Sequence, residues 1–248
     1  MIILKTEQEI AVMREANRIL AQLFEHIRSM VQPGITTLEL DREAELFIHS
    51  HGAKPSFKGY RGYPATLCTS VNDEVIHGIP GPRVLKEGDI ISIDVGALLD
   101  GFHSDAARTF PVGDISPQAR MLIEVTQKAL DAGISQAIPG NHLSDISAAV
   151  QKTAEAEGFS VVRDFVGHGI GRSLHEDPQV PNFGRKGRGP VLMEGMTLAI
   201  EPMINAGTHE VVIQKDGWTA VTADASLSAH FENSIAITRN GPVVLSAP

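Results

Sequence analysis

Near the N-terminus, hydrophobic residues recur every three or four positions, the spacing of an amphipathic helix. This pattern predicts a helix over residues 6–31, which Thr6 and Glu9 would cap reciprocally in a capping box. It predicts a second helix over residues 36–51, which opens with the same pair of residue types and is followed by a glycine. The first part of the chain is therefore expected to form two consecutive helices.

From about residue 57 the pattern changes to short apolar runs separated by glycine and proline. Two such runs, residues 90–99 and 102–112, flank Asp100-Gly101, a sequence typical of a two-residue β-hairpin turn. Two more helices are expected next, one over residues 116–139 and one that ends near Gly158. The remainder of the chain again has the pattern of short strands.

The second half of the chain repeats the order of the first, two helices followed by strands. Residues 84–94 align without gaps with residues 191–201, at an offset of 201 − 94 = 107, with five identities and an acidic residue ending both segments. Such a repeat predicts an α+β fold with an internal pseudo-twofold axis, an antiparallel sheet inside and helices outside. We expect a single domain over residues 1–248, made of two similar halves of about 1–112 and 113–248.

Composition and charge narrow the class of protein. The 248 residues carry 21 Lys and Arg against 30 Asp and Glu, a net charge of 21 − 30 = −9, which disfavours binding of nucleic acid or anionic lipid through net charge. The single cysteine excludes internal disulfides and zinc sites built from cysteine pairs. With neither a signal-peptide core nor a membrane-length apolar run, we expect a cytoplasmic protein without membrane contact.

Two acidic residues interrupt the predicted hairpin strands, where aspartate is disfavoured. In a two-residue hairpin the paired positions sum to 99 + 102 = 201, so position 94 faces 107 and position 96 faces 105. Asp94 and Asp105 then share one face of the sheet as diagonal neighbours, with Cβ atoms about 7–8 Å apart or somewhat less. Their charges would repel strongly on a buried sheet unless protons or cations neutralise them.

The second half supplies two further acids within apolar runs, Glu201 at the end of the repeated segment and Glu232. Taken singly, each acid is as compatible with a salt bridge or a cap as with a ligand. Four acids from two repeated halves, however, indicate a cation site on the pseudo-twofold axis. Their number favours two divalent ions about 3.5–4 Å apart, and added histidine suits Mn, Fe, Co or Zn. A protonated carboxyl pair, as in glycosidases, would need no histidines nearby.

Histidines occur at places that match such a site. His168 lies among small residues in a Gly-His-Gly-Ile-Gly segment, and His175 follows seven residues later. His103 and His230 lie close to acids of the key strands, and their roles stay open. Because a lone histidine is more often structural or exposed, five others are expected on helices or at the surface: His26, His49, His51, His142 and His209.

Motifs along nearly the whole chain resemble, in order and in spacing, those of the type I methionine aminopeptidases. The matching segments are Asn72–Pro80, Ser92–Gly96, Gly101–Asp105, Gly167–Gly171, Leu174–Glu176, Ile200–Met203 and Phe231–Asn233. The resemblance implies the pita-bread fold, an antiparallel sheet with outer helices and an internal pseudo-twofold. That symmetry agrees with the repeat, which the sequence shows independently.

The resemblance also implies five metal ligands, matched position by position: Asp94, Asp105, His168, Glu201 and Glu232. The counterparts of Asp105 and Glu232 bridge two ions. That of Asp94 holds one ion, and those of His168 and Glu201 hold the other. The implied cofactors are two divalent cations, with Co, Mn, Fe and Zn all compatible.

The implied activity is metal-dependent removal of the N-terminal methionine from nascent proteins and peptides, preferentially when the second residue is small. A metal-held hydroxide attacks the scissile carbonyl, and Glu201 is the candidate to carry the water's proton to the leaving amine. His175 would donate a hydrogen bond to the oxyanion, and His77 would position the amide nitrogen. The expected partners of this monomer are nascent N-termini. The solvated basic segment Arg185–Arg188 has a charge that permits transient ribosome contact, without specific nucleic-acid recognition.

The resemblance places the methionine-binding pocket on residue types that are scarce in this chain. The lining positions are Phe57, Tyr60, Tyr63, Cys68, Leu174 and Trp218, an apolar set suited to a thioether. They include both tyrosines, the only tryptophan and the only cysteine. Phe57 and Leu174 depart from the family's commonest residues at these positions, which leaves the shape of the pocket open.

Three other classes fit the sequence less well. A proline-specific peptidase of this fold usually carries a separate N-terminal domain, whereas here the first predicted helix begins at Thr6. A type II methionine aminopeptidase has a helical insertion between the last two acids, for which 232 − 201 = 31 positions leave no room. A catalytically inactive binding protein would have lost metal ligands, and all five are present.

Overall fold

The computed structural model describes residues 1–246, and the α-helices in this range are the four that the sequence predicts. They are α1 (Glu7–Arg28), α2 (Thr37–Ser50), α3 (Pro117–Ser135) and α4 (Leu143–Ala156). The capping boxes expected at Thr6 and Thr36 are both formed, which confirms the predicted starts of the first two helices. Among the described residues, no helix combines the length and apolar character needed to cross a membrane.

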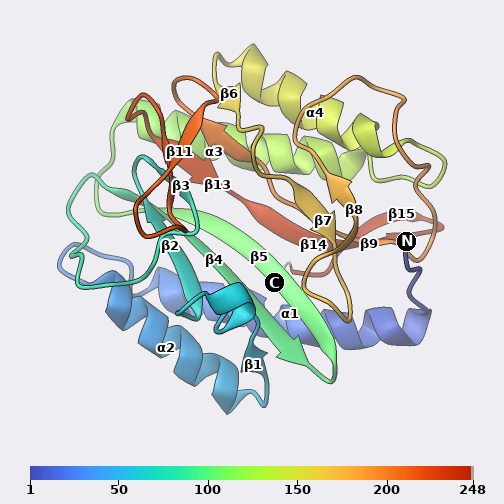
Figure 1. Cartoon of the computed structure of the whole chain (residues 1–248), viewed down its shortest axis with the longest axis horizontal. Helices are drawn as coiled ribbons and strands as arrows, with labels where there is room; N and C mark the ends of the chain where they lie inside the picture. The colour runs from blue at the N-terminus through green and yellow to red at the C-terminus, as the bar shows by residue number, and fades with distance from the viewer. Residues whose placement is uncertain (247–248) are drawn as a thin grey trace.

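The strands are short apart from one long hairpin. In chain order they are β1 (Lys54–Pro55), β2 (Leu67–Val71), β3 (Glu74–Ile76), β4 (Ile90–Leu99), β5 (Phe102–Pro111), β6 (Ser160–Val161), β7 (Gly167–Gly169), β8 (Glu176–Val180), β9 (Thr197–Ile200), β10 (Met203–Asn205), β11 (Val211–Ile213), β12 (Ala220–Thr222), β13 (Ser228–His230), β14 (Glu232–Thr238) and β15 (Gly241–Val244). The largest sheet runs β1-β4-β5-β14-β9-β7-β8, with β2 beside β4 and β15 beside β14 (Figure 1). Its pairings are antiparallel, as predicted.

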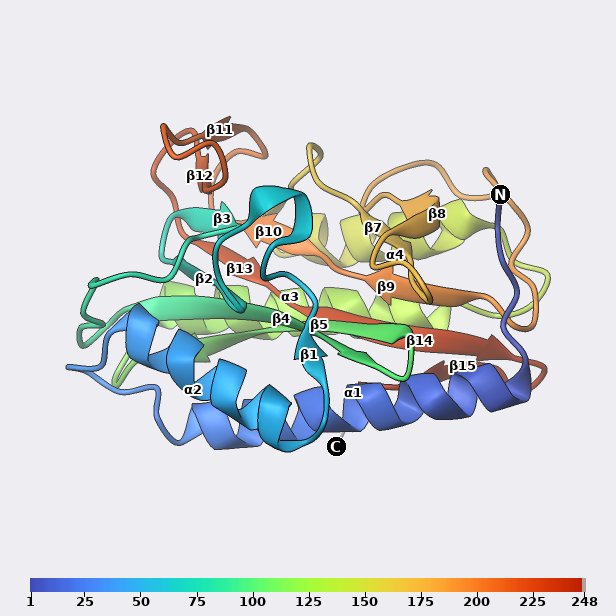
Figure 2. The ribbon, with the colours of Figure 1, turned by 60° about the horizontal axis from the view of Figure 1, so that its bottom comes forward.

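The helices lie outside this sheet, so the fold has the predicted α+β layers (Figure 2). Helices α1 and α2 bury a hydrophobic cluster against β2, β4 and β5, in which Leu20, Leu40 and Ile93 are fully buried. Helices α3 and α4 contribute Leu130 and Ile146 to a second cluster that reaches β9 and β14. The opposite face of the sheet is left for the functional groups.

The long β4–β5 hairpin has the register that the sequence predicts. Asp94 pairs with Ala107, and Gly96 pairs with Asp105. The turn residues Asp100 and Gly101 have φ angles of 48° and 81°, as a type I′ turn requires at both central positions. The two aspartates therefore lie on the same face of the sheet, as diagonal neighbours.

Candidate metal centre

Four buried carboxylates come together on neighbouring strands of the large sheet. Asp94 lies on β4 and Asp105 on β5, Glu232 begins β14, and Glu201 directly follows β9. Ala107 pairs with Asp94 on one side and with Glu232 on the other, so these two acids flank one small residue. Each of the four acids is at most 7% exposed. The sheet order thus brings acids from both halves of the chain to one place.

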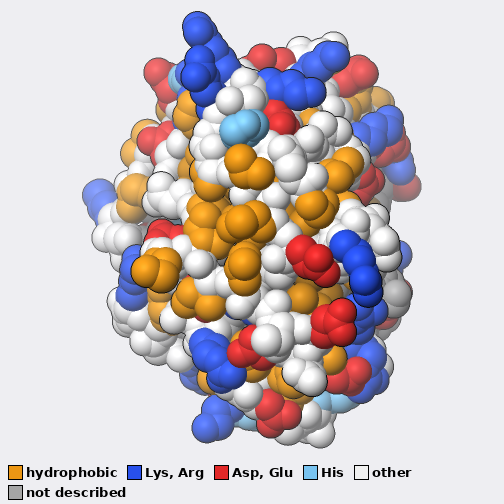
Figure 3. Space-filling model, turned by 90° about the vertical axis from the view of Figure 1, so that its right-hand side faces the viewer, with side chains coloured by type: hydrophobic (Ala, Val, Ile, Leu, Met, Phe, Trp, Pro, Cys, Tyr) orange, Lys and Arg blue, Asp and Glu red, His pale blue; other side chains and the backbone are white. Residues whose placement is uncertain are grey.

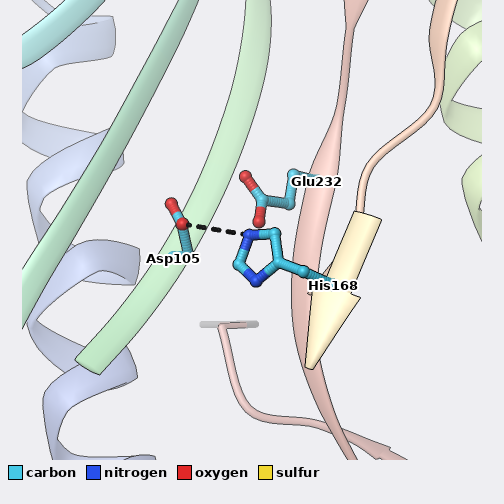
Figure 4. Close-up of side chains that lie close together, drawn as sticks. All are labelled: Asp105, His168 and Glu232. Atoms are coloured by element: carbon cyan, nitrogen blue, oxygen red, sulfur yellow. Dashed lines mark ion pairs between the residues drawn. The ribbon is translucent and has the colours of Figure 1, made fainter. Parts of the chain in front are cut away.

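His168 on β7 completes this cluster. Its Nε2 lies 3.7 Å from Asp105 Oδ2 and 3.6 Å from Glu201 Oε1. One ligand atom each from His168, Asp105 and Glu232 all lie within 4.8 Å of one another, and Figure 4 shows these three side chains converging from β7, β5 and β14. The Nδ1 atom is 2.8 Å from the Gly169 carbonyl oxygen, so it carries the proton and leaves the Nε2 lone pair facing the carboxylates.

Burial and mutual repulsion set the protonation of the cluster. Burial raises the pKa of Asp94 to about 7. Burial and the neighbouring negative charges raise the pKa values of Asp105, Glu201 and Glu232 well above the ordinary carboxyl range. Burial, with a contribution from His175, lowers the pKa of His168 to about 3, so its imidazole is neutral and able to bind a cation.

The chemistry of this cluster fits bound divalent metal. Three of its oxygens are buried without a hydrogen-bond partner: Asp94 Oδ1, Asp105 Oδ1 and Glu232 Oε1. In the described part of the chain, no lysine or arginine forms an ion pair with any of the four acids. Buried carboxylates in this state need a cation or protons. An oxygen-rich set with one imidazole is suited to Mn, Fe, Co or Zn.

A cavity of about 150 Å³ opens over the cluster. All the residues expected to bind metal or substrate line it: Phe57, Tyr60, Tyr63, Cys68, His77, Asp94, Asp105, His168, Leu174, His175, Glu201, Trp218 and Glu232. Aromatic and aliphatic side chains around Tyr63 pack as one hydrophobic group that lines the same cavity. The Tyr63 hydroxyl donates to the carbonyls of Leu67 and Gly78, and its ring meets the Trp218 ring edge-on at 5.1 Å.

His77 and His175 lie at the edge of the cluster rather than within it. His175 Nδ1 is 2.9 Å from the Tyr60 hydroxyl, and its ring centroid is 4.3 Å from that of His168. His77 directly follows β3, and its ring meets the Trp218 ring edge-on at 6.2 Å. Burial lowers the pKa of His77 to about 4 and also lowers the pKa of His175. Both rings are therefore neutral and can each donate one hydrogen bond.

Sequence reasoning did not assign three residues that the structure places in or beside the site. Arg61 and Ile76 line the cavity, each next in sequence to a residue that was expected there. His230 is buried, and its Nε2 has no hydrogen-bond partner and lies 3.7 Å from Glu201 Oε2. Its position two residues before Glu232 is the one signal in the sequence. His103, the other unassigned histidine, contacts the Ser56 hydroxyl through Nδ1 at 2.9 Å.

Comparisons with known proteins agree with this fold. Residues 11–239 match the profile of metallopeptidase family M24. The chain is 61% identical over 246 residues to a methionine aminopeptidase of Clostridium perfringens, and 54% identical to methionine aminopeptidase 1 of Bacillus subtilis, with 99% of each chain covered. It superposes on the crystal structure of methionine aminopeptidase from Thermotoga maritima with a TM-score of 0.98, 46% identity and full coverage of both chains.

The chain belongs to metallopeptidase family M24 and, within that family, to the methionine aminopeptidases. The expected pita-bread fold is confirmed by this structural neighbour. The hydrolase and metal-dependent character expected from the sequence is likewise confirmed.

Proposed function

We propose that the protein removes the N-terminal methionine from nascent proteins and peptides, preferentially when the second residue is small, in a reaction that uses two divalent metal ions. The observation that carries this proposal is a five-residue acid and histidine cluster at one end of an apolar cavity. A cavity of about 150 Å³ has room for one side chain next to the cluster. Membership of the methionine aminopeptidases supports the choice of methionine.

Five residues would hold the metal ions: Asp94, Asp105, His168, Glu201 and Glu232. Bound ions in such a site supply a hydroxide nucleophile near neutral pH and polarise the scissile carbonyl. Support for two ions comes from the number of buried acids, because one divalent cation would leave two of the four carboxylate charges without compensation. The metal could be Co, Mn, Fe or Zn, all of which this donor set accepts.

Glu201 and the two outer histidines then have separate tasks. Glu201, a carboxylate that lines the cavity within the cluster, would accept the proton of the attacking water and pass it to the leaving amine. When the Tyr60 hydroxyl donates to His175 Nδ1, the proton of the neutral ring is on Nε2, which donates to the developing oxyanion. His77 orients the amide nitrogen that becomes the leaving group.

The apolar side of the cavity reads the first side chain of the substrate. Phe57, Tyr63, Cys68 and Leu174 are buried there, with Tyr60 and Trp218 packed against them. Burial raises the pKa of the Cys68 thiol, so this residue stays protonated and acts as part of the apolar wall. A flexible thioether side chain fits such a lining.

The setting of the reaction follows from this activity. We infer a monomer that acts in the cytoplasm on emerging N-termini, with no specific nucleic-acid ligand. Transient ribosome contact through the exposed segment Arg185–Arg188 is compatible with its charge. The proposed organisation is one catalytic domain over residues 1–248 with halves of about 1–112 and 113–248. Residues 247 and 248 lie outside the described residues.

A release assay on short peptides tests the proposal. Metal-free protein is given Mn, Fe, Co or Zn, and methionine release is measured from Met-Ala-Ser and Met-Lys-Ser. Leu-Ala-Ser and Ala-Pro-Ser serve as comparison substrates. We expect rapid release from Met-Ala-Ser only, and only with added metal. Preferential cleavage of Ala-Pro-Ser would contradict the proposal and favour a proline-specific peptidase.

A further inference from the structure

In the N-terminal segment two hydrophobic side chains are exposed and a charged one is buried, the reverse of the usual arrangement. Ile3 and Leu4 are 55% and 47% exposed, while Lys5 beside them is buried. The N-terminus lies on the face shown in Figure 3, where other hydrophobic side chains also gather. Lysine is almost never buried unless it is paired. Lys5 pairs with Glu176, and the two side chains are only 4% and 7% exposed.

Lys5 is fixed at both ends. Its main-chain N–H donates to the Gly195 carbonyl at 2.7 Å, which attaches the N-terminal segment to the turn before β9. Its ammonium donates to the Ile3 carbonyl at 3.1 Å as well as to the Glu176 carboxylate. The charge of Lys5 is therefore held at one point, beside the first residue of β8.

Glu176 links Lys5 to the loop of residues 171–176, because it contacts both. Its second carboxylate oxygen accepts the main-chain N–H of Ser173 at 3.2 Å, so the loop closes on the side chain of its own last residue. A Cβ atom at Gly171 would lie 2.4 Å from Lys5 Cε and 2.7 Å from Glu176 Oε1. The absence of a side chain at Gly171 thus makes room for the ion pair.

The same loop carries two residues of the proposed active site. Leu174 is 2% exposed within the apolar wall of the cavity, and His175 lies between the Tyr60 hydroxyl and the His168 ring. Both come directly before Glu176 in the sequence. A movement of Glu176 would therefore displace the oxyanion donor and part of the methionine pocket together.

We propose that Lys5 is a positioning residue, which holds the loop of residues 171–176 through Glu176 and so sets His175 in its reactive place. This inference rests on the proposed function for its catalytic consequence, but its structural part does not. Because catalytic groups lose about 100-fold in rate when displaced by about 1 Å, the loss should be of that order in kcat. KM should change little, since most of the pocket wall belongs to other segments.

Four variants test the proposal, with metal content and the unfolding temperature measured for each. Lys5→Met leaves the Glu176 carboxylate buried and unpaired, and Lys5→Arg keeps the pair. The double variant Lys5→Met with Glu176→Gln removes both charges, so it folds even if Lys5→Met does not. Asp177→Asn is the matched control, because Asp177 pairs with the N-terminal ammonium in the same two segments but is 60% exposed.

The expected result is a fall in kcat of about 100-fold for Lys5→Met, partial recovery in Lys5→Arg, and wild-type values in Asp177→Asn. The double variant should keep metal but lose kcat, because the loop has lost its anchor. Hydrogen exchange at residues 171–175 should be faster in Lys5→Met and in the double variant. A lower unfolding temperature with unchanged kcat and unchanged exchange would overturn the proposal.

The exchange measurement separates this inference from the proposed function. If the unaltered protein released no methionine but Lys5→Met still loosened the loop, the proposed activity would be wrong and the anchoring role would stand. If the unaltered protein were active but exchange at residues 171–175 did not respond to Lys5→Met, the anchoring role would be wrong. Each result decides one of the two claims.

Discussion

The strand that carries His168 is packed so closely that one added methyl group should weaken metal binding. A Cβ atom at Gly169 would lie 2.2 Å from the Asp177 carbonyl oxygen, whereas real side-chain carbons essentially never approach within 3.0 Å. The β7 and β8 backbones must therefore separate by at least 3.0 − 2.2 = 0.8 Å in Gly169→Ala. His168 precedes Gly169 directly, so its Nε2 would leave the 3.6–3.7 Å positions beside Glu201 and Asp105.

Loss of this ligand geometry should lower metal affinity by about 10- to 100-fold, as changes around a ligand do. That factor corresponds to about 1.4–2.8 kcal/mol of binding free energy. Overpacking should also lower the free energy of unfolding by about 1–3 kcal/mol. The two effects have the same structural cause, the separation of β7 from β8.

Calorimetric titration of the metal-free protein with Mn²⁺ measures the affinity, and urea unfolding measures the stability. Gly81→Ala is the control, because its nearest neighbour atom would be 4.0 Å away and its φ is not left-handed. The control should bind Mn²⁺ like the unaltered protein. Unchanged affinity in Gly169→Ala would refute the assignment of His168 as a ligand held by the β7–β8 packing.

Three further predictions follow from the same site. His175→Ala should lower kcat by about 100- to 1,000-fold with unchanged metal content; loss of both metals, by elemental analysis, would show that His175 is a ligand. Leu174→Ala should enlarge the pocket and raise kcat/KM for Phe-Ala-Ser relative to Met-Ala-Ser, and an unchanged ratio in competition assays would exclude it from the pocket wall. In metal-free protein the free energy of unfolding should fall from about pH 6.5 to about pH 8, because burial raises the pKa of Asp94 to about 7 and the folded chain then holds a proton that the unfolded chain has released. Below about pH 6.5 the buried neutral histidines, which the unfolded chain protonates, act in the opposite direction. Urea titrations showing a rise over the higher of these two pH ranges would contradict that reasoning.

The sequence was sufficient where the structure depends on local chemistry. Capping boxes at Thr6 and Thr36 and the helical spacing of apolar residues predicted α1 and α2 within a few residues. The Asp100-Gly101 turn fixed the pairing of the long hairpin, which placed Asp94 and Asp105 on one face. Both kinds of signal act between residues close in sequence, so they can be read without knowing the rest of the fold.

Contacts between residues far apart in the sequence could not be derived from such local signals. The adjacency of β5 and β14 places Glu232 next to Ala107. Neither strand has a sequence feature that predicts its pairing with the other. Without the repeat and the family resemblance, the four acids would have remained two separate pairs. The pairing of Lys5 with Glu176 was missed, because the two residues are 176 − 5 = 171 positions apart.

The pairing of β5 with β14 also has a consequence for the kinetics of folding. Asp94 and Glu232 flank Ala107 although 232 − 94 = 138 positions separate them. Loop-closure entropy makes contacts of such sequence separation slow to form. We therefore expect the carboxylate cluster to assemble after the folding transition state, which would leave the folding rate insensitive to metal. Bound metal should act on the unfolding rate, prolonging the lifetime of the native chain.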